Sequence, residues 1–199
     1  MMVSIRRIEI SLPSWLHEYE ESFLETDFVT DEDMMEVAVE ISALNVANKT
    51  GGPFGCAIFE RCKTTKTSRL FSVGANRVTA LGNSTLHGEM VAIQFAQQKL
   101  KTFSMRQAGQ STMKEYVMCT SCEPCAMCLG GTLWSGVDEI ICSAAKADAE
   151  AIGFNEGPVF EASYKQLEDA GIKVKRDVLR KKGAKVLHEY GMTGIIYNS

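Results

Sequence analysis

Apolar residues follow a helical period in the first part of the chain and then fall into short runs typical of buried strands. Six of them recur at helical spacing: Met34, Val37, Ala38, Ile41, Leu44 and Ala47. This spacing predicts a helix with Thr30 at its N-cap and Gly51 as its stop. The apolar runs 54–59 and 69–75 predict two strands that pair as a hairpin.

The remaining pattern predicts three more strands and four more helices. We expect the strands over 116–120, 138–143 and 172–174, the helices from His87, from Pro124 and over 158–170 and 178–190, and polar connections over 76–86 and 103–114. A helix between the last two strands implies that they run parallel, because such a crossover needs one. The predicted fold class is α/β: a three-layer α/β/α sandwich around a central mixed five-stranded sheet.

Length and composition indicate one globular domain with a short extension. The 199 residues are 45% apolar and 23% charged, which is ordinary for a soluble protein with a core. Periodicity is weak over residues 1–30, so we expect an N-terminal extension there, on the surface or against a second subunit, and the main domain over 31–199. No apolar run approaches the roughly 18 residues that span a bilayer, so we expect no membrane association.

Net charge and cysteine content indicate which binding partners and which cellular compartment to expect. The net charge of −4 gives no electrostatic reason to expect a nucleic-acid partner. Seven cysteines, in a chain whose start lacks the features of a signal peptide, predict a reducing and therefore cytoplasmic location. In that compartment cysteines serve as metal ligands or buried apolar residues rather than in disulfides.

A histidine and two cysteines stand at the starts of two predicted helices. His87 begins one helix, and Cys125 and Cys128 lie one turn apart at the start of the helix that follows Pro124. One imidazole and two thiolates suit zinc, and three protein ligands plus a water or hydroxide make a catalytic site rather than a structural one. We therefore predict one Zn²⁺ per chain, with Glu89 as the proton carrier beside it.

Two other interpretations of these residues are weaker. Four cysteines recur every third residue, as in an iron–sulfur run: Cys119, Cys122, Cys125 and Cys128. Because Cys119 falls inside a predicted strand, the four sulfurs need not converge, and a cluster leaves His87 and Glu89 without a role. We expect Cys119 and Cys142 in the core and Cys122 as an uncoordinated thiol. A protein that keeps zinc only for structure has no need of an unliganded carboxylate such as Glu89.

The predicted zinc site favours one class of reaction. Zinc lowers the pKa of bound water toward about 7, so a hydroxide nucleophile forms at neutral pH. Glu89 can take the water proton, deliver it to a ring nitrogen and help to protonate departing ammonia. Together these steps are the hydrolytic deamination of an amino-substituted heterocycle.

The order H-x-E…P-C-x-x-C is the signature of zinc-dependent nucleobase deaminases. The chain resembles the cytidine deaminase-like superfamily and, within it, the bacterial guanine deaminases. The matching positions are 51–55, 76, 87–89, 120–128, 134 and 149–156. The zinc motif indicates only the superfamily, whereas the Gly-Phe-Asn-Glu segment 153–156 points to guanine. The resemblance implies that a small-molecule base, guanine, is converted to xanthine and ammonia in purine metabolism.

The resemblance also implies roles around the substrate. Asn76 is expected to hydrogen-bond the purine, Phe54 to pack against its ring, and Glu156 to act with Glu89 by accepting hydrogen bonds from the guanine edge. Trp134 is expected either to wall the pocket or to lie in the core.

Two positions depart from the pattern of the relatives. Gly88 stands where alanine is common, and its backbone N–H remains available to the substrate. Asn155 stands where many relatives carry aspartate, which leaves Glu156 as the only carboxylate of that pair.

The resemblance further implies a homodimer, with C-terminal segments exchanged so that they close the partner's active site. Tyr197 is the expected residue of this lid. Related substrates stay open, including a triazine such as ammeline and a nucleoside. A tRNA adenosine deaminase shares the zinc motif, but the basic residues between 173 and 185 are better explained as a solvated helix face, because the acidic chain has no wider basic stripe.

Overall fold

The computed structural model describes residues 8–193, 196 and 197 and has a five-stranded sheet at its centre. The strands are β1 (Gly55–Cys62), β2 (Ser68–Ala75), β3 (Lys114–Cys122), β4 (Glu139–Ala144) and β5 (Lys173–Lys175), in the spatial order β2-β1-β3-β4-β5. β1 pairs antiparallel with β2 and β3, whereas β3–β4 and β4–β5 are parallel. The mixed five-stranded sheet, its first hairpin and the parallel last pair confirm the prediction.

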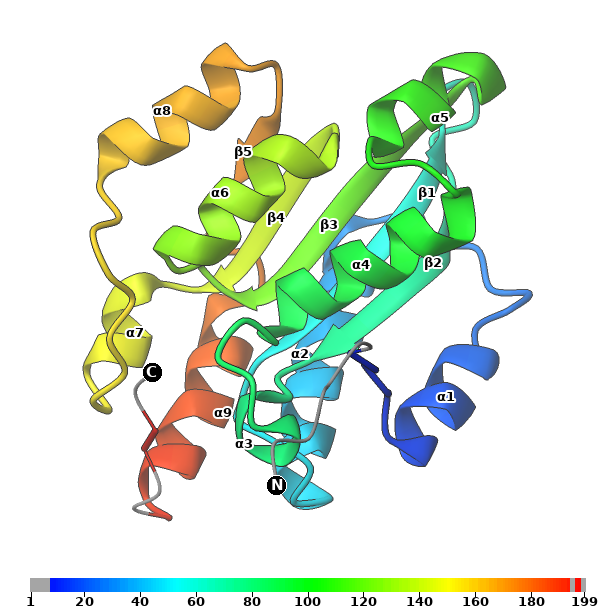
Figure 1. Ribbon diagram of the computed structural model, residues 1–199. Helices are drawn as coiled ribbons and strands as arrows, with labels where there is room; N and C mark the ends of the chain where they lie inside the picture. The colour runs from blue at the N-terminus through cyan, green and yellow to red at the C-terminus, as the bar shows by residue number, and fades with distance from the viewer. Residues whose placement is uncertain (1–7, 194–195, 198–199) are drawn as a thin grey trace, which may run out of the picture.

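Helices cover both faces of the sheet (Figure 1). They are α1 (Ser14–Glu21), α2 (Asp31–Ala47), α3 (Val78–Leu81), α4 (Gly88–Leu100), α5 (Met105–Thr112), α6 (Ala126–Ser135), α7 (Lys146–Glu150), α8 (Glu161–Asp169) and α9 (Arg180–Gly191). In Figure 1, α4 and α6 lie across the near face, and α2 and α9 lie on the far face. This arrangement is the predicted α/β/α sandwich.

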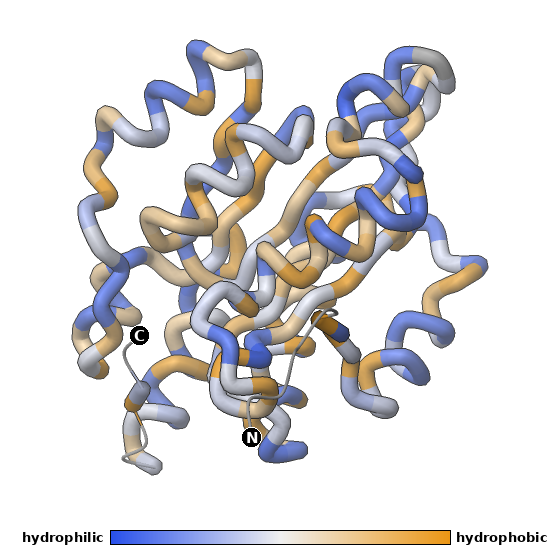
Figure 2. Tube along the Cα trace, in the orientation of Figure 1, coloured by the Kyte–Doolittle hydropathy of each residue, from blue (hydrophilic) through white to orange (hydrophobic). Residues whose placement is uncertain are grey.

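The central strands supply apolar side chains to two cores, one on each face of the sheet. Ile58, Met118 and Ile140 belong to the core under α4, while their neighbours Phe59, Val117 and Ile141 belong to the core under α2. Side chains alternate between the faces of a strand, so continuous apolar runs bury both faces. The centre of the sheet is accordingly among the most apolar parts of the trace in Figure 2.

The helix after Thr30 forms as its sequence predicts. The Thr30 hydroxyl accepts a hydrogen bond from the Asp33 backbone N–H at 3.1 Å, and the helix ends at Ala47, before Gly51. The N-terminal part of the chain packs beside it: Leu16 of α1 and Phe28 are buried in the same core. Phe28 and Ser68 also exchange backbone hydrogen bonds of 2.8 and 2.9 Å.

Four helices lie where the sequence predicts no helix, and one of them is α1, within the extension 1–30. α3 and α7 are short, and α5 falls in the connection predicted over 103–114. Ser104 is the N-cap residue of α5 and its hydroxyl accepts a hydrogen bond from the Gln107 N–H; Met105 is the one fully buried apolar side chain that the structure describes in this helix. A single buried apolar side chain gives no apolar periodicity, which explains why this helix has no signature in the sequence.

No helix formed by the described residues has the length and apolarity needed to cross a lipid bilayer.

Gly74 allows α4 to lie directly on β2. A Cβ atom at this position would overlap the carbonyl oxygen of Gly88 and lie 2.5 Å from the backbone nitrogen of Ala92. Gly74→Ala is therefore expected to lower the free energy of unfolding by about 2 kcal/mol, since overpacking against backbone forces the elements apart. Urea denaturation measures this loss. The matched change Gly130→Ala on α6, where a Cβ would only touch Trp134 at 3.8 Å, should not destabilise the fold; equal losses in both variants would contradict the close-approach argument.

Candidate active site

The predicted metal ligands lie at the N-termini of α4 and α6, which start at the same edge of the sheet (Figure 1). His87 is the N-cap residue of α4, and Cys125 is the N-cap residue of α6. The helix thus begins at Ala126, two residues after Pro124, because Cys125 is in an extended conformation. Cys128 lies in the first turn of α6 and is completely buried.

The three side chains converge closely enough to hold one ion. The Sγ atom of Cys125 is 3.5 Å from Nδ1 of His87, and the ligand atoms of His87, Cys125 and Cys128 all lie within 4.8 Å of one another. Tetrahedral zinc with bonds of about 2.0–2.3 Å keeps its ligand atoms at a similar separation. The Cys128 thiol, by hydrogen-bonding to Cys125, lowers the pKa of Cys125 to about 4, which favours the thiolate that a metal requires. The residues present fit zinc.

Two buried carboxyl groups stand beside this cluster. Glu89 lies in the first turn of α4 and is 7% exposed; burial raises the pKa of its carboxyl group, and the charge of Cys125 adds to the shift. Glu156 lies in the segment between α7 and α8 and is also 7% exposed. Burial, followed by the charge of Cys125, raises the pKa of Glu156 to about 8. Perturbed carboxyl groups in one cavity are typical of a reaction site.

One enclosed cavity gathers most of the predicted residues. It is lined by Phe54, Asn76, His87, Glu89, Glu123, Cys125, Phe154, Asn155, Glu156 and Tyr197. Asn76 is buried, and its side-chain oxygen accepts a hydrogen bond from the Val78 N–H at 3.2 Å. Tyr197 lines the cavity of its own chain, and its hydroxyl is buried without a hydrogen-bond partner among the described residues.

Trp134 does not belong to this cavity, and the prediction for it is wrong. Its side chain is 77% exposed, so it neither walls the pocket nor lies in the core. α6 buries the side on which Cys128, Leu129 and Thr132 lie. Trp134 lies one turn after Gly130, on the outer side of the helix, and this placement cannot be derived from its apolar character alone.

Gly88 does not line the cavity but packs tightly beside it. A Cβ atom at this position would lie 3.3 Å from the carbonyl oxygen of Phe54, so an alanine would press against the residue that precedes β1. The cysteines outside the ligand set also lie as expected: Cys119 and Cys142 are completely buried core residues, and Cys122 is buried with its sulfur 3.7 Å from the Ala145 carbonyl oxygen.

Three lining residues were not among the predicted site residues, namely Glu123, Phe154 and Asn155. Phe154 makes edge-to-face contacts with Phe54 and Tyr197, at ring-centroid distances of 4.9 and 5.3 Å. The signal was available in the sequence, because Glu123 lies two residues before a metal ligand and Phe154 two residues before Glu156.

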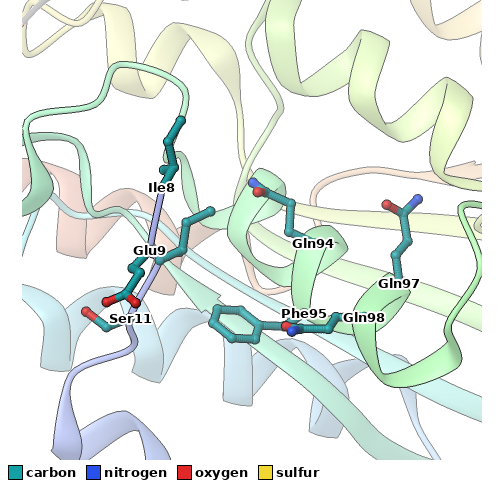
Figure 3. A pocket seen from close by; sticks show the side chains of 8 residues that line it. Ile8, Glu9, Ser11, Gln94, Phe95, Gln97 and Gln98 are labelled. Atoms are coloured by element: carbon teal, nitrogen blue, oxygen red, sulfur yellow. The ribbon is translucent and has the colours of Figure 1, made fainter. Parts of the chain in front are cut away.

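A larger cavity, of about 640 Å³, lies between residues 8–11 and α4 (Figure 3). Among the described residues, its lining consists of Gln94, Gln97, Gln98 and mostly uncharged neighbours, with Glu9 as the one carboxylate. This lining offers no metal-ligating set and no pair of titratable groups, so size alone does not identify the reaction site.

Comparison with known proteins agrees with the geometry. The family model for the cytidine and deoxycytidylate deaminase zinc-binding region matches residues 29–144. The guanine deaminase of Bacillus subtilis is 30% identical over 141 residues, which are 71% of this chain and 81% of that protein. A tRNA-specific adenosine deaminase of Buchnera aphidicola is 25% identical over 122 residues, 61% of this chain and 72% of that one.

Solved structures extend the similarity over nearly the whole chain. The structure of a guanine deaminase from Nitrosomonas europaea is 33% identical, with a TM-score of 0.82, and the match covers 96% of this chain and all of that one. A structure in complex with 8-azaguanine is 34% identical, with the same TM-score and coverage of 94% and 98%. The family model, the fold and the set of metal ligands all agree with one another. The chain belongs to the cytidine and deoxycytidylate deaminase family of zinc-dependent hydrolases.

Proposed function

We propose that this chain deaminates free guanine to xanthine and ammonia. The observation that carries the proposal is the buried carboxyl group of Glu156 in the same cavity as Glu89 and the metal ligands. Guanine presents ring and amino N–H donors that a carboxylate accepts, and adenine and cytosine do not present these donors in the same place. The similarity to two guanine deaminases supports this choice of substrate.

The residues divide the reaction between them. His87, Cys125 and Cys128 would hold the metal; zinc, when bound, supplies Lewis acidity that makes water acidic enough to lose a proton near neutral pH. Glu89 takes that proton and delivers it to a ring nitrogen; it then takes the second proton of the water, from the hydroxyl group formed at C2, and delivers it to the amino group. A carbon–oxygen bond forms at C2 of guanine, the bond from C2 to the amino nitrogen breaks, and ammonia leaves.

The other cavity residues orient the base. Asn76 hydrogen-bonds the purine through its side-chain amide, Phe54 packs against the ring, and Tyr197 closes the cavity. Glu156 accepts from the ring N–H beside the reacting carbon. The pKa of Glu156 is raised in the protein without metal or substrate. The charge of a bound metal and the N–H donors of guanine both favour the carboxylate form, so they lower this pKa when they bind.

Replacement of Asn76 should weaken recognition without removing the metal. Asn76→Ala is expected to lower kcat/KM for guanine by about 10- to 100-fold, the effect of losing one or two buried hydrogen bonds to the substrate. Steady-state kinetics of zinc-loaded protein measures it. The control is Asn83→Ala in the same loop, whose side chain bonds only to Thr85 among the contacts of the described residues. Unchanged kinetics in Asn76→Ala would contradict its role.

A panel of substrates tests the proposed base. We expect zinc-loaded protein to release ammonia from guanine at least about tenfold faster, by kcat/KM, than from ammeline, guanosine or adenine. Faster release of ammonia from ammeline or guanosine would support the deamination reaction but contradict guanine as the substrate.

The structure offers little support for a tRNA substrate. Five of the seven basic residues from 173 to 185 are paired with carboxylates: Lys175 with Asp31 and Glu139, Arg176 with Glu123 and Glu161, Arg180 with Asp148, Lys182 with Glu36, and Lys185 with Glu189. Paired charges make a weak polyanion site. Salt-dependent retention of the protein on tRNA would revive this alternative.

We further propose that the enzyme works as a cytoplasmic homodimer in purine metabolism, with residues 31–199 as the catalytic domain and its C-terminal lid. The outer side of α6, where Trp134 is exposed and a Cβ atom at Gly130 would meet only Trp134, supports association through this helix. The exchange of C-terminal segments between protomers stays a prediction. Sedimentation velocity of the wild type and of Trp134→Glu tests association: a dimer that dissociates in the variant supports it, and a wild-type monomer contradicts it.

A further inference from the structure

The segment that carries Glu156 is held from two sides. It follows α7 and leads into α8, in yellow in Figure 1. On one side, the backbone N–H of Ala126, next to the metal ligand Cys125, donates to the carbonyl oxygen of Glu156 at 3.0 Å. On the other side, the ammonium group of Lys146 donates to the carbonyl oxygens of Gly157 at 3.3 Å and Val159 at 3.1 Å.

Lys146 is itself fixed to the wall of the cavity. Its backbone N–H donates to Oε2 of Glu123 at 2.8 Å, and Glu123 is 5% exposed and lines the cavity. The other oxygen of Glu123 accepts a hydrogen bond from Nε of Arg176, which comes directly after β5. The hydrogen bonds that link Arg176, Glu123 and Lys146 therefore connect the sheet, the metal-binding loop and the Glu156 segment.

Arg176 is held firmly in this arrangement. Its guanidinium group lies over the ring of Tyr164, 4.6 Å from the centroid, and donates to both oxygens of Glu161 at 3.0 and 2.9 Å. Charge-assisted hydrogen bonds to a planar guanidinium fix geometry as well as supplying energy.

We propose that Lys146 is a positioning residue for Glu156: it sets the place of the Glu156 carboxyl group opposite the metal ligands, and its kinetic effect rests on the proposed function. The two carbonyl groups that it binds directly follow Glu156, and Gly157 takes a left-handed conformation (φ +69°) that turns the chain there. Without the ammonium group, the backbone directly after Glu156 loses its hydrogen bonds to α7, and the Ala126 bond and the packing of Phe154 and Val159 remain. Glu156 then samples positions outside hydrogen-bond reach of the base.

A structural role within α7 is the competing explanation. Lys146 also lies 3.4 Å from the Glu150 carboxylate, four residues later in the same helix. The Glu150 side chain is 47% exposed, and such surface pairs contribute little. If Lys146 serves only to stabilise α7 through this pair, its replacement should act independently of Glu156. A double-mutant experiment therefore separates the two explanations.

The experiment compares zinc-loaded Lys146→Met, which keeps the aliphatic stem, with Lys165→Met, which removes a lysine paired with Asp169 on neighbouring α8. Hydrogen–deuterium exchange over residues 154–160 reports the segment without any substrate. We expect exchange to be about tenfold faster in Lys146→Met and unchanged in Lys165→Met, with zinc content equal in both. Exchange that does not change in Lys146→Met overturns the proposal, whatever the substrate proves to be.

Kinetics with guanine then tests the link to Glu156. Lys146→Met should lower kcat/KM about tenfold, mainly through KM, and Lys146→Arg should restore most of it. In a Glu156→Gln background the same change should have no further effect, because the residue being positioned is already replaced. Additive losses overturn the proposal. A wild type inactive on guanine refutes the proposed substrate instead, and the exchange measurement then decides on positioning alone.

Discussion

Glu89→Gln is expected to abolish deamination while zinc stays bound. The substitution keeps the shape of the side chain in the first turn of α4 but removes its ability to take and return a proton. General acid–base catalysis contributes about 10²–10⁴-fold to rates, and here one group serves at each proton transfer, so we expect a loss at the upper end of this range. Initial rates of ammonia release from guanine measure the loss.

Zinc content and thermal unfolding are the controls for this variant. Both should equal those of the wild type, because Glu89 is not among the three ligand residues. Glu21→Gln, at an exposed position on α1, controls for the loss of a carboxylate and should keep full activity. Activity of Glu89→Gln within a few-fold of the wild type would remove Glu89 from the mechanism.

Cys128→Ala should remove the metal and, with it, all activity. Cys128 is completely buried in the first turn of α6, so no water-exposed group can take its place as a ligand. With only His87 and Cys125 left, we expect zinc content to fall from one ion per chain to nearly none, since two ligands do not hold zinc firmly. Elemental analysis after dialysis, together with ammonia release, measures both changes.

Cys142→Ala is the matched control for a buried thiol. Cys142 is equally buried but lies in β4, within the core and outside the ligand set. Its replacement should cost about 1 kcal/mol of stability through the lost sulfur and leave the zinc content unchanged. Cys122→Ala should also retain zinc. Loss of metal from Cys122→Ala would instead favour the iron–sulfur arrangement of the four regularly spaced cysteines.

The sheet and the long helices are predictable because each carries an unambiguous period. α2 has a side-chain cap and a sustained apolar repeat, and the central strands are continuous apolar runs. α5 lacks such a repeat, since Met105 is the one fully buried apolar side chain that the structure describes in it. Gly183 shows the opposite limit: it weakens α9 by propensity, yet a Cβ atom there would lie 2.6 Å from the Ser143 hydroxyl, so the close packing of α9 on the sheet requires it.

The metal ligands are predictable for a different reason, namely that the chemistry restricts them to few residue types at fixed spacing. The rest of the site depends on contacts between distant segments. Arg176 meets Glu123 from 53 positions away, and no local pattern signals this pair. Trp134 was predicted wrongly because being apolar does not determine which side of α6 a residue occupies.

The measurement that tests the proposed deamination most directly is the balance of products formed from guanine. Protein loaded with one zinc ion per chain is mixed with guanine, and xanthine and ammonia are quantified over time. We predict one xanthine and one ammonia for each guanine consumed, at a rate that Glu89→Gln does not support. A folded, zinc-loaded protein that forms neither product would contradict the proposed function.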